Sequence, residues 1–288
     1  MGSIWLALGF LDALVGTGFS YSRTAQGFKT GDMKHAISCY NFPRKSHPKY
    51  DSNPLYVAGD SYSGMIVPII TQAISDDIEP NHLLLGNPFT DAKFDGNSKI
   101  ICYNRMALIS DELYESAKSN CKQEYIDVEI SNRMCANDLQ TISENYYCYL
   151  CKVWATDINV QKALHIRKGS IKEWVKCNKS LDYDDDVASV VSYHLCLNTR
   201  GYRALIYSGD HDLAVTYVGT ESWIKSLNLS IVDDWRPWIV DGQVAGYSRE
   251  YGNNFTFATV KGAGHTAPEY KPKESFSMFK RWISQQPL

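Results

Sequence analysis

Short apolar runs alternate along the chain with segments whose apolar residues recur every three or four positions. Four of the runs predict buried strands: Leu55–Gly59, His82–Gly86, Ala204–Tyr207 and Thr256–Val260. Runs of this length, bounded by glycine and polar residues, are typical of strands in a parallel sheet with both faces covered. Helical spacing follows the first run, over residues 65–75, and returns after Pro272. Strands that alternate with helices predict a mainly parallel α/β sheet.

The middle of the chain has a different pattern. Ser110, followed by two acidic residues, predicts the start of a helix, with Lys118 and Lys122 in its last turn. Most of the eight cysteines also lie in this part. We therefore expect one α/β domain over residues 1–288, with a helical, disulfide-containing insertion at residues 101–175.

The composition narrows the class of partner. A net charge of −3 favours neither nucleic acid nor an anionic membrane as a partner. No apolar run approaches the ~18 residues that a membrane-spanning helix needs. The acidic run at residues 182–186 is interpreted as a solvated loop rather than a metal site, and no cofactor is predicted.

Two features of the sequence disagree about the compartment. The first residues lack the basic segment of a signal peptide, and Asp12 interrupts their apolar stretch, so no signal peptide is predicted. The cysteines, and three glycosylation sequons at Asn178, Asn228 and Asn254, favour the secretory pathway.

The segment Gly59-Asp-Ser-Tyr-Ser-Gly64 carries the strongest chemical signal. It follows a predicted strand and precedes a predicted helix. A nucleophile on such a turn needs small residues two positions before and after it, because the backbones crowd there. Gly59 and Ser63 meet that demand around Ser61, which is the candidate nucleophile. A surface serine in a tight turn is the alternative interpretation of this element.

A serine hydroxyl needs a base to take its proton and a third group to orient that base. Asp210 and Asp212 follow the predicted strand at residues 204–207, and His265 follows the one at residues 256–260. Open α/β sheets place their sites at these carboxyl ends of strands. The chain order of serine, acid and histidine is that of α/β-hydrolases. On the position in the sequence alone, either aspartate fits the role of the acid that orients His265.

Several segments together resemble the plant serine carboxypeptidase-like family. They run along nearly the whole chain and are GDSYSG, YSGDHDLAV, DDWRPW, QVAGYSREY, KGAGHTAPEYKP, FLDALVGTGFSYS and ALHIRKGS. The resemblance implies an α/β-hydrolase fold, Ser61 as nucleophile, His265 as base and Asp212 as its orienter, with Asp210 as the alternative. It also implies an oxyanion-binding N–H at Tyr62 and a disulfide between Cys121 and Cys135.

Two chemistries exist within this family. The peptidases resemble G-E-S-Y-A-G, whereas this chain has Asp60, Ser63 and Arg236 in WRPW, the pattern of the branch that transfers acyl groups from glucose esters. The resemblance thus implies a small-molecule acyl donor, a 1-O-acylglucose, and an acceptor hydroxyl, with Gly59 and Asp60 at the substrate. A carboxypeptidase is the alternative. The resemblance places the protein in the vacuole or outside the cell, and the sequence does not indicate an oligomeric state.

The chain also departs from the family pattern. The family's N-G-G-P-G segment has no counterpart, since no Gly-Gly pair occurs, and we expect an incomplete sheet and an oxyanion site with one backbone donor. Pro43 and Pro48 predict that residues 34–51 lack a long helix. These departures favour an N-terminally truncated form, and a catalytically inactive fragment is the third hypothesis.

Overall fold

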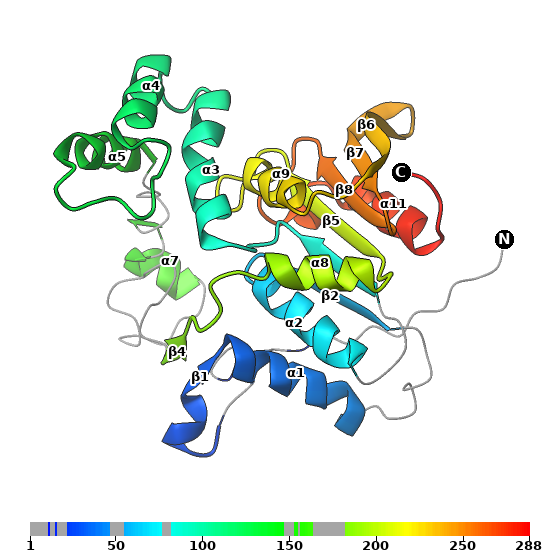
Figure 1. Ribbon diagram of the computed structural model, residues 1–288. Helices are drawn as coiled ribbons and strands as arrows, with labels where there is room; N and C mark the ends of the chain where they lie inside the picture. Colours follow the sequence, from blue (N-terminus) through cyan, green and yellow to red (C-terminus); the bar gives the residue numbers. More distant parts are fainter. Residues whose placement is uncertain are drawn as a thin grey trace. The chain divides into compact units, whose positions relative to one another are not determined.

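The computed structural model describes residues 11, 15, 22–46, 55–76, 82–146, 153–154, 156–163 and 182–288 (Figure 1). The chain divides into two compact units. The first, here called the sheet unit, comprises Met1–Tyr103 and Tyr183–Leu288, and the second, the helical unit, comprises Asn104–Asp182. The helical insertion predicted at residues 101–175 overlaps the second unit.

The sheet unit is built on six strands in the order β2-β3-β5-β8-β7-β6. Their bounds are β2 Tyr56–Asp60, β3 His82–Gly86, β5 Ala204–Gly209, β8 Phe255–Val260, β7 Gln243–Tyr251 and β6 Ile231–Val240. The first four strands in this order run parallel, and β7 and β6 add an antiparallel edge. The mainly parallel sheet expected from the sequence is therefore confirmed. A separate two-stranded ladder pairs β1 (Thr30–Gly31) with β4 (Tyr183–Asp184).

The antiparallel edge was not among the predicted strands. Asp241 and Gly242 join β6 to β7, with φ angles of 48° and 75°. Two successive residues with positive φ match the twist of a tight hairpin, and Asp-Gly is a favoured pair for it. This dipeptide was the signal in the sequence that could have predicted the hairpin.

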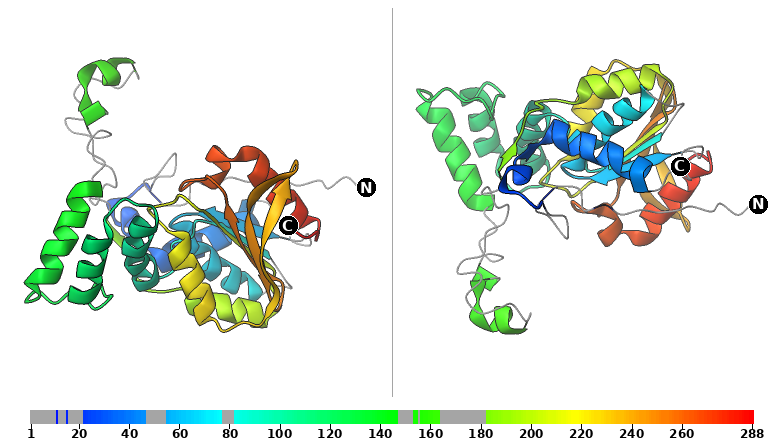
Figure 2. Two further views of the ribbon diagram at one scale, coloured as in Figure 1. Left: turned by 90° about the horizontal axis from the view of Figure 1, so that it is seen from above. Right: turned by 90° about the horizontal axis from the view of Figure 1, so that it is seen from below.

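Both faces of the sheet are covered, which explains why the strands are apolar along their whole length. On one face, Leu85 and Ile206 pack with Trp223 and Ile224 of α9. On the other face, Leu205, Val260 and their neighbours pack with Met278 and Trp282 of α11. Figure 2 shows α11 on the opposite side of the sheet from α8 and α9. Alternate residues of one strand thus enter two separate cores.

Seven α-helices and a 3₁₀-helix (η1) of the sheet unit lie in the described residues. They are η1 Ala25–Phe28, α1 Asp32–Ser46, α2 Ser63–Ser75, α3 Ala92–Arg105, α8 Val191–Thr199, α9 Tyr217–Ser226, α10 Ala267–Tyr270 and α11 Pro272–Ile283. The helical segments predicted at residues 65–75 and after Pro272 are present as α2 and α11. Within the described ranges, no helix is long and apolar enough to cross a membrane.

The prediction that residues 34–51 lack a long helix is wrong. Helix α1 spans Asp32–Ser46 and runs through Pro43. A proline removes one backbone donor and disturbs the turn before it. Only three residues of α1 follow Pro43, so the helix ends within one turn of the proline. Pro48 lies outside the described residues.

The helical unit contains α4 (Asp111–Asn120), α5 (Arg133–Tyr146) and α7 (Ile158–Ala163). Ser110 caps α4 as predicted, its hydroxyl accepting a 3.3 Å hydrogen bond from the Leu113 N–H. The helix ends at Asn120, so Lys118 lies in its last turn and the expectation for Lys122 is wrong. The expected disulfide between Cys121 and Cys135 joins the end of α4 to the start of α5. Cys148, Cys151 and Cys177 lie outside the described residues.

Candidate active site

Ser61 lies on the sharp turn between β2 and α2, as expected. Its φ angle is 58°, in the left-handed region that non-glycine residues seldom adopt. The crowding that the sequence implied is present, because a Cβ on Gly59 would stand 2.4 Å from the Cβ of Ser63. A Cβ on Gly64 would stand 2.4 Å from the Phe89 carbonyl oxygen. The turn therefore requires these two glycines, and it presents the Ser61 side chain beyond the end of the sheet.

Three side chains from three strand ends converge at this edge of the sheet. His265 Nε2 lies 2.8 Å from Ser61 Oγ, and His265 Nδ1 lies 2.8 Å from Asp212 Oδ2. Since a carboxylate can only accept, the Nδ1–H donates to Asp212, and Nε2 is left to accept from the Ser61 hydroxyl. We call this chain of two hydrogen bonds the relay. The structure thus brings together the three residues singled out in the sequence.

Asp212 is only 1% exposed, and its carboxylate is fully surrounded by donors. The backbone N–H groups of Ala214 and Val215 donate to Oδ1 at 2.8 Å and 3.3 Å. The Asn87 Nδ2–H donates to Oδ2 at 2.7 Å, the same oxygen that accepts from His265. These bonds offset the cost of burying a charged group.

Asp210, the alternative acid, is engaged elsewhere. Its Oδ1 lies 2.6 Å from His211 Nδ1 and accepts a 2.7 Å hydrogen bond from the Gly262 N–H. Gly262 has a φ of 71°, a conformation that favours glycine. Asp210 therefore ties together the two loops that carry Asp212 and His265, and the geometry leaves Asp212 as the partner of the histidine.

Tyr62, next to Ser61, is held by an acidic cluster. Its hydroxyl lies 2.8 Å from Asp32 Oδ1 and 3.0 Å from Asp185 Oδ1, and its ring stacks on Phe89. Burial, followed by the bonds to Asp32 and Asp185, raises the pKa of the Tyr62 hydroxyl above its ordinary range. The hydroxyl thus remains a donor. The oxyanion role of the Tyr62 N–H stays a prediction, as does the absence of an upstream donor, which concerns segments outside the described residues.

The acidic run at residues 182–186 is more than the solvated loop we expected. Tyr183 donates to Asp32 at 2.7 Å, and the Met33 N–H donates to Asp186 at 3.3 Å. The buried Asp32 also accepts from the Val187 N–H at 3.0 Å. The run therefore holds the first turn of α1 in place, because Asp32, the first residue of that helix, accepts hydrogen bonds from Tyr183 and Val187.

Asp60 is the last residue of β2 and directly precedes the nucleophile. Burial raises the pKa of its carboxyl to about 6; His265 opposes this rise, while Asp212 and Glu269 add to it. Its Oδ1 is buried and unpaired within the described residues, and it points towards Gly86, where an added Cβ would stand 2.5 Å away. The carboxyl therefore lies back against β3.

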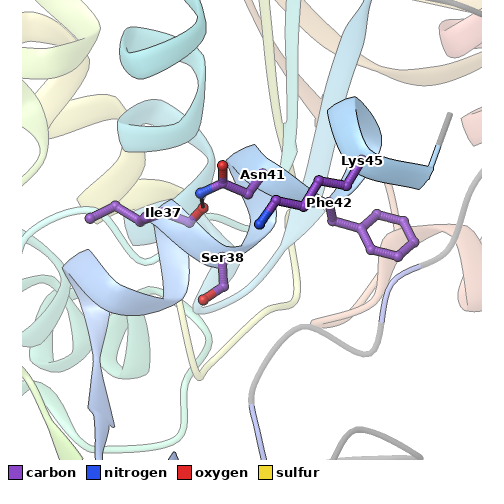
Figure 3. Close-up of a pocket in the computed structure, with 5 residues that line it drawn as sticks. All are labelled: Ile37, Ser38, Asn41, Phe42 and Lys45. Atoms are coloured by element: carbon purple, nitrogen blue, oxygen red, sulfur yellow. Dashed lines mark hydrogen bonds between the residues drawn. The ribbon is translucent and has the colours of Figure 1, made fainter. Parts of the chain in front are cut away.

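The remaining predicted positions lie away from the relay. Asn228 and Asn254 are exposed, each with positive φ, and Asn178 lies outside the described residues. A pocket on α1 is shown in Figure 3 and is lined by Ile37, Ser38, Asn41, Phe42 and Lys45. None of these five residues belongs to the relay, so the pocket has no part in the site.

Comparison with known proteins agrees with the fold and with the motifs. The sequence profile of the serine carboxypeptidase family matches residues 5–152 and 144–285. Serine carboxypeptidase-like 2 of Arabidopsis thaliana is 47% identical over 313 residues, which cover 97% of this chain and 71% of that protein. Serine carboxypeptidase-like 17 of the same plant is 46% identical over 315 residues, with the same two coverages.

A solved structure supports the fold. A prohormone-processing carboxypeptidase from Saccharomyces cerevisiae superposes with a TM-score of 0.70 at 19% identity, covering 96% of this chain and 73% of that one. Identity this low shows a shared fold, whereas the two plant proteins and the family profile show relationship. The chain therefore belongs to the serine carboxypeptidase family, and it is an enzyme of the serine carboxypeptidase-like kind.

Proposed function

We propose that this protein transfers acyl groups through a covalent intermediate on Ser61. The observation that carries the proposal is the relay, in which Ser61 Oγ, His265 and Asp212 are joined by two 2.8 Å hydrogen bonds. A serine hydroxyl in contact with an imidazole that a buried carboxylate orients is the arrangement that activates a nucleophile.

The steps follow from the positions of the protons. Ser61 Oγ attacks the acyl carbonyl carbon while its proton moves to His265 Nε2, which gives a tetrahedral oxyanion and an imidazolium beside Asp212. The imidazolium then protonates the departing sugar oxygen, the ester bond to the sugar breaks, and the acyl group remains on Ser61. His265 next takes the proton of an acceptor hydroxyl, whose oxygen attacks the acyl carbon, and finally returns that proton to Ser61 Oγ.

Asp60 supports an acyltransferase rather than a carboxypeptidase. Binding the carboxylate of a peptide's C-terminus would require a proton shared with an acid here, whereas Asp60 is one methylene shorter than the glutamate of the peptidase pattern and lies back against β3. Two carboxylates in contact repel each other. An ionised Asp60 is instead a good acceptor for a neutral hydroxyl group. The proposed reaction is transfer from a 1-O-acylglucose ester to an acceptor hydroxyl.

The experiment compares the two chemistries on one protein. We expect a 1-O-acylglucose with an alcohol acceptor to give a new ester, and blocked dipeptides to remain intact at pH 7. The Ser61→Ala variant is the control, because it removes the nucleophile and little volume. Peptide hydrolysis without ester formation would instead support the serine carboxypeptidase. Hydrolysis that appears only below about pH 6 would indicate that Asp60 protonation permits it.

An inactive fragment is the remaining hypothesis. It predicts that a fluorophosphonate labels Ser61 no faster than it labels an exposed serine. It also predicts no cooperative thermal transition if the fragment does not fold. A cooperative transition together with stoichiometric labelling that Ser61→Ala abolishes would contradict both forms of this hypothesis.

We also infer passage through the secretory pathway, with a vacuolar or extracellular destination. The disulfide between Cys121 and Cys135 supports an oxidising compartment. The exposure of Asn228 and Asn254 supports glycosylation at both sequons. Treatment of the protein from its native tissue with an N-glycosidase should lower its mass. No change in mass would count against glycosylation at all three sequons.

A further inference from the structure

Asn87 was not among the residues expected at the site, yet it lies at the centre of it. It follows β3, and β3 lies between β2, which leads to Ser61, and β5, which leads to Asp212. The carboxyl ends of parallel strands meet at one edge of a sheet. The residue after β3 is therefore positioned between the nucleophile and the acid.

The side chain of Asn87 is fixed at both of its polar atoms. Its Nδ2–H donates to Asp212 Oδ2 at 2.7 Å, and its Oδ1 accepts from the Gly209 N–H at 3.3 Å. The residue is 0% exposed, and its own N–H donates to the Tyr207 carbonyl at 2.7 Å. Its φ angle of 42° is one that asparagine tolerates better than most residues.

The same segment also holds the nucleophile through backbone bonds. The Ser61 N–H donates to the Gly86 carbonyl, and the Phe89 N–H donates to the Ser61 carbonyl, both at 3.0 Å. Residues 86–89 thus contact the nucleophile on one side and the acid on the other. The distance between Ser61 and Asp212, which His265 bridges, therefore depends on this short segment.

We propose that Asn87 is a positioning residue of the relay, acting through Asp212 on His265. This inference rests on the proposed function of the relay. Asn87 and His265 donate to the same oxygen of Asp212, so Asn87 holds the oxygen that the imidazole contacts. Its amide also withdraws negative charge from that oxygen, which lowers the tendency of His265 to take a proton. A carboxylate without this donor would hold the imidazolium more strongly.

Two variants separate these effects. Asn87→Leu keeps the approximate volume and removes both hydrogen bonds. Asn87→Asp keeps the shape and the acceptor for Gly209, and it places a second acid beside Asp212. Asn198→Leu is the matched control, because Asn198 is also buried and its Nδ2–H donates to the Gly252 carbonyl, away from the relay.

The first measurement is the rate of Ser61 labelling by a fluorophosphonate as a function of pH. We expect Asn87→Leu to lower the plateau rate about 10- to 100-fold, since misplacement of a reacting group by about 1 Å has an effect of that size. We expect the acid limb of the profile to move to higher pH in Asn87→Leu. Asn87→Asp should stay closer to the wild type, because two buried carboxyl groups in hydrogen-bond contact share one proton, and the protonated acid still donates to Asp212. Asn198→Leu should leave the plateau rate within about twofold of the wild-type rate and the acid limb at the wild-type pH.

The second measurement is the titration of the His265 ring by NMR, which does not depend on activity. A rise in the pKa of His265 in Asn87→Leu that is largely reversed in Asn87→Asp supports the inference even if Ser61 fails to label, in which case the proposed function fails and the positioning role stands. An unchanged His265 titration, or a lower plateau rate without a shift of the acid limb, would reduce Asn87 to a packing residue and overturn the inference. If Asn87→Leu does not fold, Asn87→Gly decides the question, because it removes the same donor and tolerates the positive φ at this position.

Discussion

Each of the two units of this chain is stabilised internally in a different way. The sheet unit buries large side chains on both faces of its sheet, and Trp223, Trp238, Phe255 and Phe257 are at most 1% exposed. The described part of the helical unit buries fewer side chains, among them Ala117, Tyr125 and Ile142, and the disulfide between Cys121 and Cys135 joins α4 to α5. A small helical layer with little apolar burial gains most from a covalent link.

The site lies in the sheet unit, whose strands are held by apolar packing on both faces. Ser61, Asn87, Asp212 and His265 follow β2, β3, β5 and β8, four adjacent strands of one ladder. The relay depends on distances of 2.8 Å, and short loops anchored at strand ends in a close-packed core can keep such distances. We therefore expect the geometry of the relay to be set within the sheet unit.

The sharpest test of this division is the removal of the base. His265→Ala should lower the acyl-transfer rate by about 10⁶-fold, because members of a serine relay act as a unit. The side chain is 34% exposed, so the unfolding transition should change little. Rates of ester formation and urea unfolding curves would be measured on the same preparation. His211→Ala is the control, since His211 contacts Asp210 and not Ser61. A similar loss of rate in both variants would contradict the assignment of His265.

The next test addresses the covalent link. Replacing both Cys121 and Cys135 by alanine should destabilise the helical unit by about 3 kcal/mol, the value for closing a loop of roughly 15 residues. Limited proteolysis should then cut residues 104–146 faster. Ser61 labelling should stay within about twofold of the wild-type rate. A large loss of labelling would show that the two units are coupled, against the division drawn here.

A smaller effect is expected from the charge of Asp60. The pKa of this carboxyl in the folded protein is about 6, above its ordinary value of 3.8, so the folded state holds a proton that the unfolded chain has lost. That contribution to stability is fully present below about pH 3.8 and is lost as the pH rises through 6. Asp60→Asn should therefore stabilise the protein at pH 8, by no more than about 2 kcal/mol after allowance for solvent screening, and by about half as much at pH 5.

The matched control for Asp60→Asn is Asp76→Asn, for which we expect a change in stability of the opposite sign. The hydrogen bond from Arg200 lowers the pKa of the exposed Asp76, so Asp76→Asn should slightly destabilise the protein at both pH values. Urea unfolding at pH 5 and pH 8 measures all four cases. A stabilisation by Asp60→Asn that is the same at both pH values would show that its charge is not the cause.

The smallest effect tests the helical unit locally. Ser110→Ala removes the side-chain cap of α4 and should destabilise the unit by about 1 kcal/mol. Ser119→Ala, on the exposed surface of the same helix, should be neutral or slightly stabilising because alanine favours helices. Hydrogen exchange of the first turn of α4 would report both changes. Equal protection in the two variants would mean that the cap contributes nothing.

The sequence predicted the parts of the site in which the chemistry and the backbone make the same demand. The turn around Ser61 required small neighbours, and Gly59 and Ser63 provide them. The strand ends carrying Asp212 and His265 were visible because each apolar run stops at a polar loop. The choice of Asp212 over Asp210 came from the family resemblance, since both aspartates follow the same strand.

Other features depended on tertiary contacts that a pattern does not contain. Asn87 follows a predicted strand, but its importance arises from the order β2-β3-β5, which brings residues far apart in sequence to one carboxylate. Helix α1 tolerates Pro43 because of its position near the end, and Asp32 is anchored by distant donors such as Tyr183. The residues that contact Asn87 and Asp32 lie more than ten positions away in the sequence. The position of Pro43 in its helix depends on where α1 ends.

The neighbouring positions of β3 and β5 also constrain how the molecule is made. Leu83 pairs with Ala204, so β3 leaves the ribosome more than a hundred residues before its partner exists. During that interval one flank of the apolar strand HLLLG has no ladder to join, and an unpaired strand edge invites association with other chains. Pairing between such distant segments is also slow. The chain between them includes the helical unit, which can form from local contacts while β3 waits. Early folding of that unit would shorten the loop that has to close before β5 pairs with β3. The order in which the segments are synthesised therefore affects how this sheet assembles.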